Sequence, residues 1–479
     1  MSIGEAGVTG QDTARLSLPL VQQRVRQELA QERDRLLREA GLNYLTHGHF
    51  KRPVERPFTR AQRDTTTILI GGLTFRHDEL ILAGLRGLGY KVARLPTPSK
   101  SDFQTGKEYG NNGQCNPTYF TVGNLVNYLK DLRDNKGIPT ERILDDYVFA
   151  TAGSCGPCRF GMYEAEYRLA LRNSGFDGFR VLLFDQTAGV DQLTEGAGID
   201  FGLPLFLTLL NAFFLGDLLN EVAYQIRPYE VVPGSTDRAF AECLKICQDA
   251  LENKNYAAIR GNWLSRKLSR RLVGNDNDLA QVFDQLRSDN CTSALSRCRE
   301  LLQEKVEVDY TRPRPLVKVT GEFWAQTTEG DGNFRMFPFL EGEGAQVLVE
   351  PVATWVSYIL HGARMSYRDS QGLMPGQKPP RGWHLLARFR HWLNFRFKLG
   401  LLGLADTILK REYERLRVAL GGTAHRLVSQ LELQRLGHPY YNSKAEGGEG
   451  HMEVAKNIYY ANHELAHMVL SLKPFGCMP

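Results

Sequence analysis

Asp146-Tyr-Val-Phe-Ala150 runs directly into Thr151-Ala-Gly-Ser-Cys155-Gly-Pro-Cys158-Arg-Phe160, and a helical pattern continues to Asn173. The apolar run predicts a buried strand, and the glycine and proline between the two cysteines predict a tight turn. A strand, a turn and a helix in this order are typical of a parallel sheet, which binds ligands at the carboxyl ends of its strands. We therefore expect Cys155 and Cys158 to lie at that edge, where the helix dipole favours negative charge.

Two further cysteines occupy similar settings elsewhere in the chain. Cys115 lies in Gly113-Gln-Cys115-Asn-Pro117, before a helical pattern, and Cys477 follows the strand-like run Met468-Val-Leu-Ser-Leu472. Four thiolates suit a [4Fe–4S] cluster, and three would leave one iron open to a substrate or water. The residues therefore favour an iron–sulfur site that combines these two cysteines with the pair in the tight turn.

Other uses of the paired cysteines stay open at this point. Zinc sites and disulfide exchange also use two cysteines separated by two residues. A zinc ribbon usually carries a second such pair about 15 to 20 residues further on, and the sequence has none there. A thioredoxin-like redox pair normally opens a helix in a smaller domain, and a chance pair without metal is the remaining alternative.

The composition indicates a multidomain globular protein. A chain of 479 residues is too long for one compact core, so we expect two or three domains. The net charge of +5 is too small and too dispersed to indicate nucleic-acid binding. Eight cysteines without a recognisable signal peptide favour a cytoplasmic, reducing location and metal or redox use over a disulfide framework.

The longest apolar run is Leu203 to Leu219. It is interrupted by Pro204, Asn211, Gly216 and Asp217. Such interruptions favour a buried helix over a membrane span, so we expect no transmembrane segment.

The alternation of strand-like and helical patterns predicts an α/β fold with two Rossmann-like lobes, mostly parallel sheets and a helical middle segment. The strand-like runs are Thr67–Ile70, Lys91–Leu95, Asp146–Ala150, Arg180–Phe184, Leu316–Thr320, Gln346–Glu350 and Met468–Leu472. We expect an N-terminal helical extension and tether over residues 1–64, with a helix from Leu20 to Ala40. Three further regions follow: a first α/β lobe with the paired cysteines over 65–235, a helical segment over 236–312, and a second α/β lobe with the last cysteine over 313–479.

The remaining four cysteines fall within the helical segment. Cys243 and Cys247 are four residues apart and Cys291 and Cys298 are seven apart, so each pair shares one face of a helix. Because cysteine behaves as a small apolar residue in a core, we expect these four to pack there rather than to bind a metal.

A helical pattern from Trp383 to Leu399 mixes basic and aromatic residues. They are Arg388, Arg390, Arg396 and Lys398 with Trp392, Phe395 and Phe397. Such a mixture occurs in helices that bind membrane surfaces or nucleic acids. The simpler expectation is that the aromatic side chains pack inward while the basic groups reach water.

Two glycine-rich loops precede helical patterns. They are Glu329-Gly330-Asp331-Gly332-Asn333 and Gly447-Gly448-Glu449-Gly450-His451. Both are typical of tight turns, in which glycine and asparagine adopt positive φ angles. Backbone N–H groups at the start of a helix also bind anions, and His451 could neutralise charge or relay a proton.

His463-Glu464-Leu-Ala-His467 matches the pattern of zinc hydrolases, in which two histidines on one helical face bind zinc and the glutamate acts as base. We expect a helix from Met452 to His467 here. Only twelve residues follow His467, which leaves little room for a third ligand. A polar helix surface is therefore the favoured interpretation.

Taken together, several motifs resemble one family, the dehydratase-like region of large proteins in the 2-hydroxyacyl-CoA dehydratase and activase superfamily. The resemblance covers most of the chain from about Thr65. The motifs are Gln114-Cys115-Asn-Pro-Thr-Tyr-Phe-Thr-Val-Gly-Asn124, Gly156-Pro-Cys158-Arg-Phe-Gly-Met-Tyr163, Gly321-Glu-Phe-Trp324, Gly447-Gly-Glu-Gly-His-Met-Glu453 and Pro474-Phe-Gly-Cys477-Met-Pro479.

The resemblance implies a [4Fe–4S] cluster and a role in electron transfer. A separate activator with an actin-like ATPase fold would deliver electrons to the cluster, and an acyl-CoA or other thioester would be the substrate. The implied ligands are Cys115, Cys155, Cys158 and Cys477, and the two glycine-rich loops would line the same cleft. Apart from the resemblance, the position of Arg159 beside Cys158 suits either a charge partner near the cluster or a surface salt bridge.

The sequence departs from the family in two ways. No actin-like ATP-binding signature precedes Thr65, so we expect the activator to be a separate protein. Related chains continue beyond the Phe-Gly-Cys-Met-Pro run, so a second subunit is expected to supply the missing segment. A non-catalytic assembly subunit is the other alternative to a dehydratase-like or reductase-like component.

Overall fold

The computed structural model describes residues 18–39, 56–153, 158–185, 198–272, 274–373, 385–445 and 448–477. The chain forms two units, Met1–Val54 and Glu55–Pro479, which are described separately. In the first unit, α1 (Leu18–Glu39) is a helix whose described side chains are mostly exposed. This helix confirms the helical extension that the sequence predicts.

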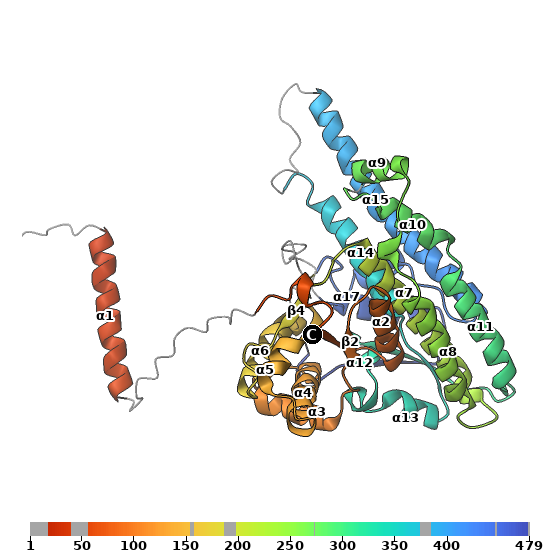
Figure 1. Cartoon of the computed structure of the whole chain (residues 1–479), viewed down its shortest axis with the longest axis horizontal. Coiled ribbons are helices and arrows are strands. Elements are labelled where there is room, and N and C mark those ends of the chain that lie inside the picture. The colour runs from red at the N-terminus through yellow and green to blue at the C-terminus, as the bar shows by residue number, and fades with distance from the viewer. Residues whose placement is uncertain are drawn as a thin grey trace, which may run out of the picture. The chain divides into compact units, whose positions relative to one another are not determined.

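The second unit is a mixed α/β structure with two small parallel sheets (Figure 1). The four-stranded sheet has the order β2-β1-β3-β4 and the three-stranded sheet has the order β6-β5-β7. All neighbouring strands are parallel. The strands are β1 (Thr67–Ile70), β2 (Val92–Arg94), β3 (Tyr147–Gly153), β4 (Val181–Asp185), β5 (Leu316–Gly321), β6 (Gln346–Leu348) and β7 (Met468–Leu472). The predicted α/β class is confirmed, and each strand overlaps a predicted run.

Helices make up most of the remainder of this unit, and Figure 1 shows α2, α7 and α8 packed side by side. The helices of the first half are α2 (Phe75–Gly87), α3 (Lys100–Tyr109), α4 (Asn116–Lys130), α5 (Thr140–Asp146), α6 (Tyr163–Asn173), α7 (Leu203–Ile226), α8 (Ser235–Glu252), α9 (Trp263–Leu272) and α10 (Asp278–Arg287). Those of the second half are α11 (Asn290–Lys305), α12 (Phe323–Thr327), α13 (Met336–Gly342), α14 (Val352–Asp369), α15 (Leu385–Ala419), α16 (Gln430–Gly437) and α17 (Gly450–Asn462).

Helices cover both faces of the four-stranded sheet. Ile68 and Val148 belong to a core that also contains residues of α2, α7 and α8. Leu69 and Phe149, the next residues along the same strands, belong to a second core with residues of α4 and α6. Because successive side chains of a strand point to opposite faces, the near-continuous apolar runs of β1 and β3 supply both cores.

The two faces of the three-stranded sheet differ in polarity. Val317 and Val319 pack with Phe337 of α13 and Tyr224 of α7 in an apolar core. Lys318, between them in β5, is fully buried on the opposite side of the strand. This sheet therefore buries an ionisable group, which needs a partner inside the protein.

The apolar run that begins at Leu203 forms the central helix α7. By length and composition alone α7 could cross a membrane, with a mean hydropathy of 1.5, but 72% of its most apolar window is buried inside the protein. Its polar residues have internal partners. The Asp217 carboxylate accepts hydrogen bonds from the N–H groups of Val352 and Ala353 at 2.6 and 2.9 Å, and the prediction of a buried helix is confirmed.

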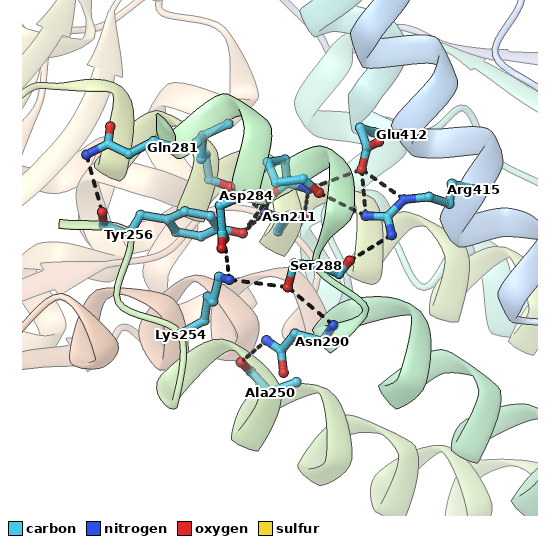
Figure 2. Close-up of polar contacts among 12 residues, drawn as sticks. Asn211, Ala250, Lys254, Tyr256, Gln281, Asp284, Ser288, Asn290, Glu412 and Arg415 are labelled. Carbon is cyan, nitrogen blue, oxygen red and sulfur yellow. Dashed lines mark hydrogen bonds and ion pairs between the residues drawn. The ribbon is translucent and has the colours of Figure 1, made fainter. Parts of the chain in front are cut away.

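A network of buried polar side chains joins the helical middle of the chain to α15 (Figure 2). Asn211 donates a hydrogen bond to Gln285 Oε1 at 2.9 Å, and Gln285 Nε2 donates to Glu412 Oε2 at 3.3 Å. Arg415 then connects Glu412, at 2.8 Å, to the carbonyl of Ser288, at 2.7 Å. The network stabilises the contacts among α7, α10 and α15, because the side-chain groups that it buries bond to one another.

The helix predicted over Trp383 to Leu399 is longer than expected and packs differently. Its aromatic residues do not all face inward: Phe395 stacks on Tyr367 of α14 at 5.3 Å between ring centroids, whereas three others are half exposed. These are Phe389 (60%), Trp392 (51%) and Phe397 (49%). The prediction of inward packing is wrong for them, because the buried residues of α15 begin only at Leu409.

Candidate functional site

Cys115 and the segment before Cys477 are in direct contact. Cys115 is the N-cap residue of α4 and is buried. The N–H of Asn116 donates to the carbonyl of Phe475 at 3.1 Å. A Cβ atom on Gly476 would lie 3.2 Å from the Cα of Cys115, so only a residue without a side chain fits there. The chain after β7 therefore lies against the start of α4.

Cys158 completes a group of three neighbouring thiols, which we call the thiol site (Cys115, Cys158 and Cys477). Cys158 follows β3 and accepts a hydrogen bond from the N–H of Phe160 at 3.4 Å. The charges of Cys115 and Cys158 both act on Cys477, where they raise the pKa of its thiol. Residues distant in sequence thus come together: one after β3, one after β7 and one at the N-terminus of α4. Cys155 lies outside the described residues.

The pKa values of two of these thiols are raised. Burial is the largest cause for Cys477, followed by the neighbouring carboxyl of Glu322, and the pKa rises to about 12. Burial also raises the pKa of Cys158, partly offset by the Phe160 N–H. Without a bound cation these thiols are therefore protonated at neutral pH, and a metal would have to displace their protons.

Two glutamates accompany the thiols. Glu322 follows β5 and its carboxylate accepts hydrogen bonds from the N–H groups of Trp324 and Ala325, at 3.1 and 2.8 Å. Glu449 accepts from the N–H of Phe323 and from Trp355 Nε1, the latter at 2.6 Å. Both carboxyls act on the pKa of Cys158 and Cys477. The thiol site is therefore lined by carboxyl groups as well as sulfur.

Both carboxyls have raised pKa values. Desolvation is the main cause for Glu322, whose pKa rises to about 7. Desolvation and then the neighbouring Glu322 raise the pKa of Glu449 to about 8. Glu322 was not predicted as a site residue, and Glu449 was predicted only as part of a glycine-rich loop that lines the cleft. The available signal was their place directly after a strand and directly before a helix, within two of the motifs quoted above.

The thiol of Cys115 also has polar neighbours. Its sulfur lies 3.1 Å from Thr118 Oγ1 and 3.4 Å from Tyr163 Oη. Burial, and then the charge of Cys115, hold the pKa of Tyr163 well above its usual value. The Tyr163 hydroxyl is therefore a neutral donor that can stabilise a thiolate at position 115.

A buried ionic cluster lies behind this site. Lys318 Nζ and Glu350 Oε2 are 2.8 Å apart, and Lys456 Nζ lies 3.8 Å from the same oxygen. The two ammonium groups hold the pKa of Glu350 down at about 2 despite its burial. Burial lowers the pKa of Lys456 to about 8. One carboxylate thus serves two buried lysines, and the charges of Glu350 and Glu449 both act on Lys456.

The loop Glu329-Gly330-Asp331-Gly332-Asn333 connects the two halves of the unit. Its carboxylates bind the first N–H groups of two helices: Glu329 accepts from Phe75 of α2 at 2.9 Å, and Asp331 accepts from Lys100 of α3 at 3.0 Å. These bonds cap helix N-termini, where negative charge is favourable. That the loop lines the thiol site stays a prediction.

The second glycine-rich loop borders the thiol site. A Cβ atom on Gly448 would lie 3.7 Å from the Cβ of Cys158, and one on Gly450 would lie 2.9 Å from the Tyr441 ring. Glu449 points to the backbone of Phe323. His451, in the first turn of α17, lines a separate cavity between α14 and α16. The segment from Gly448 to His451 thus lies between the thiols and that cavity.

The zinc-hydrolase pattern does not form a helical metal site. α17 ends at Asn462, and Glu464 has a positive φ of 53°. His467 has left the helix: its N–H donates to the carbonyl of Leu316, and its Nδ1 accepts from the N–H of the same residue. The predicted helix to His467 is therefore wrong, because pairing of the following segment with β5 ends it earlier.

The donor atoms of the thiol site fit an iron–sulfur cluster, because such clusters are held by cysteine thiolates. Within the described part of the chain, no three His, Cys, Asp or Glu side chains are already arranged to hold a metal ion. Cys155 belongs to the same turn as Cys158 but is not among those residues, and nothing is described of the side chain of Arg159. No known protein family, curated protein or solved structure matches the chain.

Proposed function

We propose that the chain is a [4Fe–4S]-binding, electron-accepting component related to 2-hydroxyacyl-CoA dehydratases. Cys115, Cys158 and Cys477, with Cys155 as the fourth thiol, would hold the cluster. When bound, it would supply single-electron transfer and an iron that acts as a Lewis acid toward a substrate oxygen. The two parallel sheets would then be the Rossmann-like lobes of this superfamily.

One observation carries the proposal: three cysteines from distant parts of the sequence lie near one another, one after β3, one after β7 and one at the N-terminus of α4. Cys115 and Cys158 both act on the charge of Cys477, and the chain before Cys477 is bonded to the start of α4. Open α/β sheets bind their ligands at the carboxyl ends of their strands. Chance burial of thiols would not require three separate loops to converge there.

The surrounding residues would tune such a cluster. Tyr163 and Thr118 offer hydroxyl groups to the sulfur of Cys115, and hydrogen bonds to ligand sulfurs raise the reduction potential of a cluster. Glu322 and Glu449, if ionised, would lower that potential, because their negative charge opposes the addition of an electron. The residues of the chain would thus set how strongly the reduced cluster donates electrons.

The proposed partners follow from the same relationship. Electrons would come from a separate ATP-dependent activator with an actin-like fold, and the substrate would be an acyl-CoA or another thioester. A second subunit would complete the substrate pocket. We place this component in the cytoplasm, where thiolate ligands stay reduced.

The test is anaerobic purification of the full chain, followed by iron, sulfide and zinc analysis and an absorption spectrum before and after dithionite. We expect about four iron atoms per chain and a visible absorption band that dithionite bleaches. Iron near zero with stoichiometric zinc would overturn the proposal.

Matched cysteine variants assign the ligands. Cys158→Ala and Cys477→Ala are expected to lose at least half of the iron, because each removes one proposed ligand. Cys291→Ala also replaces a cysteine, but one buried in the core between α8 and α11, and it is expected to keep its iron. Equal iron in all three variants would contradict the assignment.

A further inference from the structure

A cavity of about 300 Å³ lies between α14, α16 and the start of α17. This volume is at the lower end of the range of small-ligand sites and about ten times the share of one water molecule in the liquid. The wall is largely apolar, with contributions from Met365 and Leu373, and it carries a set of polar side chains: His361, Gln430, Gln434, Ser443, Lys444 and His451. None of these residues belongs to the thiol site.

His451 is almost fully buried in the wall of the cavity. Its side chain is 4% exposed, and neither ring nitrogen makes a hydrogen bond of good geometry, although the backbone of Gln434 is close enough to act on the ring. A neutral imidazole carries one donor and one acceptor. Leaving a buried polar group unpaired costs about 1–3 kcal/mol. A ligand in the cavity that bonds to this ring would recover that free energy.

The acceptor atoms of the other polar side chains in the wall already receive hydrogen bonds for the most part. Gln434 Oε1 lies 3.0 Å from His361 Nε2, which must be the donor, because a carboxamide oxygen only accepts. Gln434 Nε2 donates in turn to Ser443 Oγ at 3.2 Å. The second N–H of Gln434 is then unused, and the ring of His451 has only the backbone of Gln434 nearby, in poor hydrogen-bond geometry. An occupant that accepts hydrogen bonds suits this wall best.

The rim carries one cation that can be shared. Lys444 Nζ lies 2.6 Å from Asp369, and the Lys444 side chain is 56% exposed. An ammonium group has three donors, so this ion pair leaves two of them for a ligand. Asp369 offsets the positive charge, so a singly charged anion suits the rim better than a doubly charged one.

We propose that this cavity binds a small molecule through a carboxylate, with Lys444 and the amide of Gln434 as donors at the rim and His451 bonding to its inner end. The site is distinct from the thiols but lies close to them. A Cβ atom on Gly448 would lie 3.7 Å from the Cβ of Cys158. Tyr358, a wall residue, donates its hydroxyl hydrogen to the carbonyl of Gly448 at 3.2 Å. A bound acid would therefore occupy the far side of the wall that Gly448 to His451 forms.

The experiment titrates the full chain with acetate, lactate and succinate, and with inorganic phosphate at matched ionic strength, by calorimetry and thermal unfolding. We expect saturable binding of at least one carboxylate at one site per chain, with a rise in unfolding temperature that follows mass action. No saturable carboxylate binding below about 10 mM, a weak but measurable affinity, would overturn the proposal. Phosphate binding as tight as the best carboxylate would overturn it too.

Two lysine variants make a matched pair. Lys444→Met removes the cation at the rim and is expected to weaken binding about tenfold, the usual size of one charge-assisted hydrogen bond. Lys473→Met removes an equally exposed lysine, 58% exposed and 3.3 Å from Glu453, outside the cavity wall, and should bind as tightly as the unchanged chain. Equal weakening in both variants would contradict the proposed site.

A substitution at the inner end distinguishes the cavity from a surface site. His451→Leu is expected to abolish binding, because it removes both ring nitrogens, and His451→Gln to restore part of it, because glutamine offers a donor and an acceptor. The His451→Gln variant also controls for folding, since it fills the position with a polar side chain of similar length. If His451→Gln folds and His451→Leu binds as tightly as the unchanged chain, the occupant does not reach this ring and the proposal is wrong. The same conclusion follows if both variants bind as tightly as the unchanged chain.

Discussion

The described part of the chain contains two groups of cysteines in different surroundings. Cys158 and Cys477 follow strands β3 and β7, and Cys115 is the N-cap residue of α4; carboxyl or hydroxyl groups lie beside them. The other group lies on the facing sides of α8 and α11 in the main core. Its members are Cys243, Cys247, Cys291 and Cys298.

The second group is held by packing and by weak sulfur contacts. Cys247 Sγ and Cys298 Sγ are 3.9 Å apart, and Cys298 Sγ donates to the carbonyl of Cys243 at 3.6 Å. All four side chains are almost fully buried. The prediction that these cysteines serve as small core residues is therefore confirmed by their packing.

The difference teaches that the location of a thiol, more than its spacing in sequence, indicates its use. Strand ends carry backbone and side-chain groups that are not committed to regular hydrogen bonding, so charged partners such as Glu322 can gather there. A helix face in a core is surrounded by apolar side chains and by backbone groups that already bond within the helix. Ionisable neighbours act on both groups, but they differ in sign: the carboxyls of Glu322 and Glu449 raise the pKa of Cys477, whereas Arg415 and Lys254 lower that of Cys291.

Thiol reactivity should show the largest contrast. In the metal-free native protein, Cys158 and Cys477 are partly exposed whereas Cys291 is buried. A small aromatic disulfide reagent should therefore label the first two at least about 100-fold faster, since core thiols react only when the structure opens. Labelled peptides identified by mass spectrometry give the rates. Equal rates for Cys291 and Cys477 would remove the distinction between the two groups.

Serine substitution should give the next largest effect. Cys291→Ser places a hydroxyl in a site where burial is the main reason that the pKa of the thiol rises to about 12, so we expect a loss of about 2 kcal/mol of unfolding free energy from the unpaired polar group. Cys115→Ser should cost about 1 kcal/mol or less, because Thr118 and Tyr163 can bond to the new hydroxyl. Urea unfolding of the metal-free chains measures both, with Cys291→Ala as the control for lost volume.

The opposite order of the two serine variants would mean that hydrogen bonding does not distinguish the two surroundings. In that case the contacts of Cys115 with Thr118 and Tyr163 would be incidental. The alanine control separates this outcome from a simple effect of side-chain volume.

The smallest expected effect is a change in how stability depends on pH. Glu322 and Glu449 have native pKa values of about 7 and 8, above the usual value of 4.5. The native state therefore binds more protons than the unfolded state between about pH 4.5 and 8. Their contribution to stability is complete below pH 4.5 and is lost as the pH rises through 7 and 8. The urea midpoint of the metal-free chain should fall over this range.

The double variant Glu322→Gln with Glu449→Gln should show a shallower fall. Some slope should remain, because burial also raises the pKa of Asp78 to about 7, and that carboxyl is distant in sequence from the thiol site. An unchanged slope in the double variant would show that the two glutamates titrate normally in the native protein.

Much of the secondary structure was predictable from local sequence. The bounds of β1 and β7 agree with the runs Thr67–Ile70 and Met468–Leu472. Apolar β-branched runs between turn residues are sufficient to identify such strands. The buried helix α7 was predictable for a similar reason, since its polar residues are too few to give it a solvent-facing side.

The ends and surfaces of helices were less predictable. α17 stops at Asn462 because the chain beyond it pairs with β5, which no pattern within the helix records. The aromatic residues of α15 stay half exposed because its first half contributes no buried side chain. A local pattern shows which residues share a helix face but not whether another element covers that face.

The sequence by itself determined the elements, the parallel α/β class and the placing of cysteines next to strand ends, because these depend on residues close together along the chain. Only the tertiary structure decided that Cys115 and Cys158 meet Cys477, that Glu322 and Glu449 join them, and that His451 lines a separate cavity. The physical reason is that these contacts depend on how two sheets dock, and docking is set by packing between residues hundreds of positions apart.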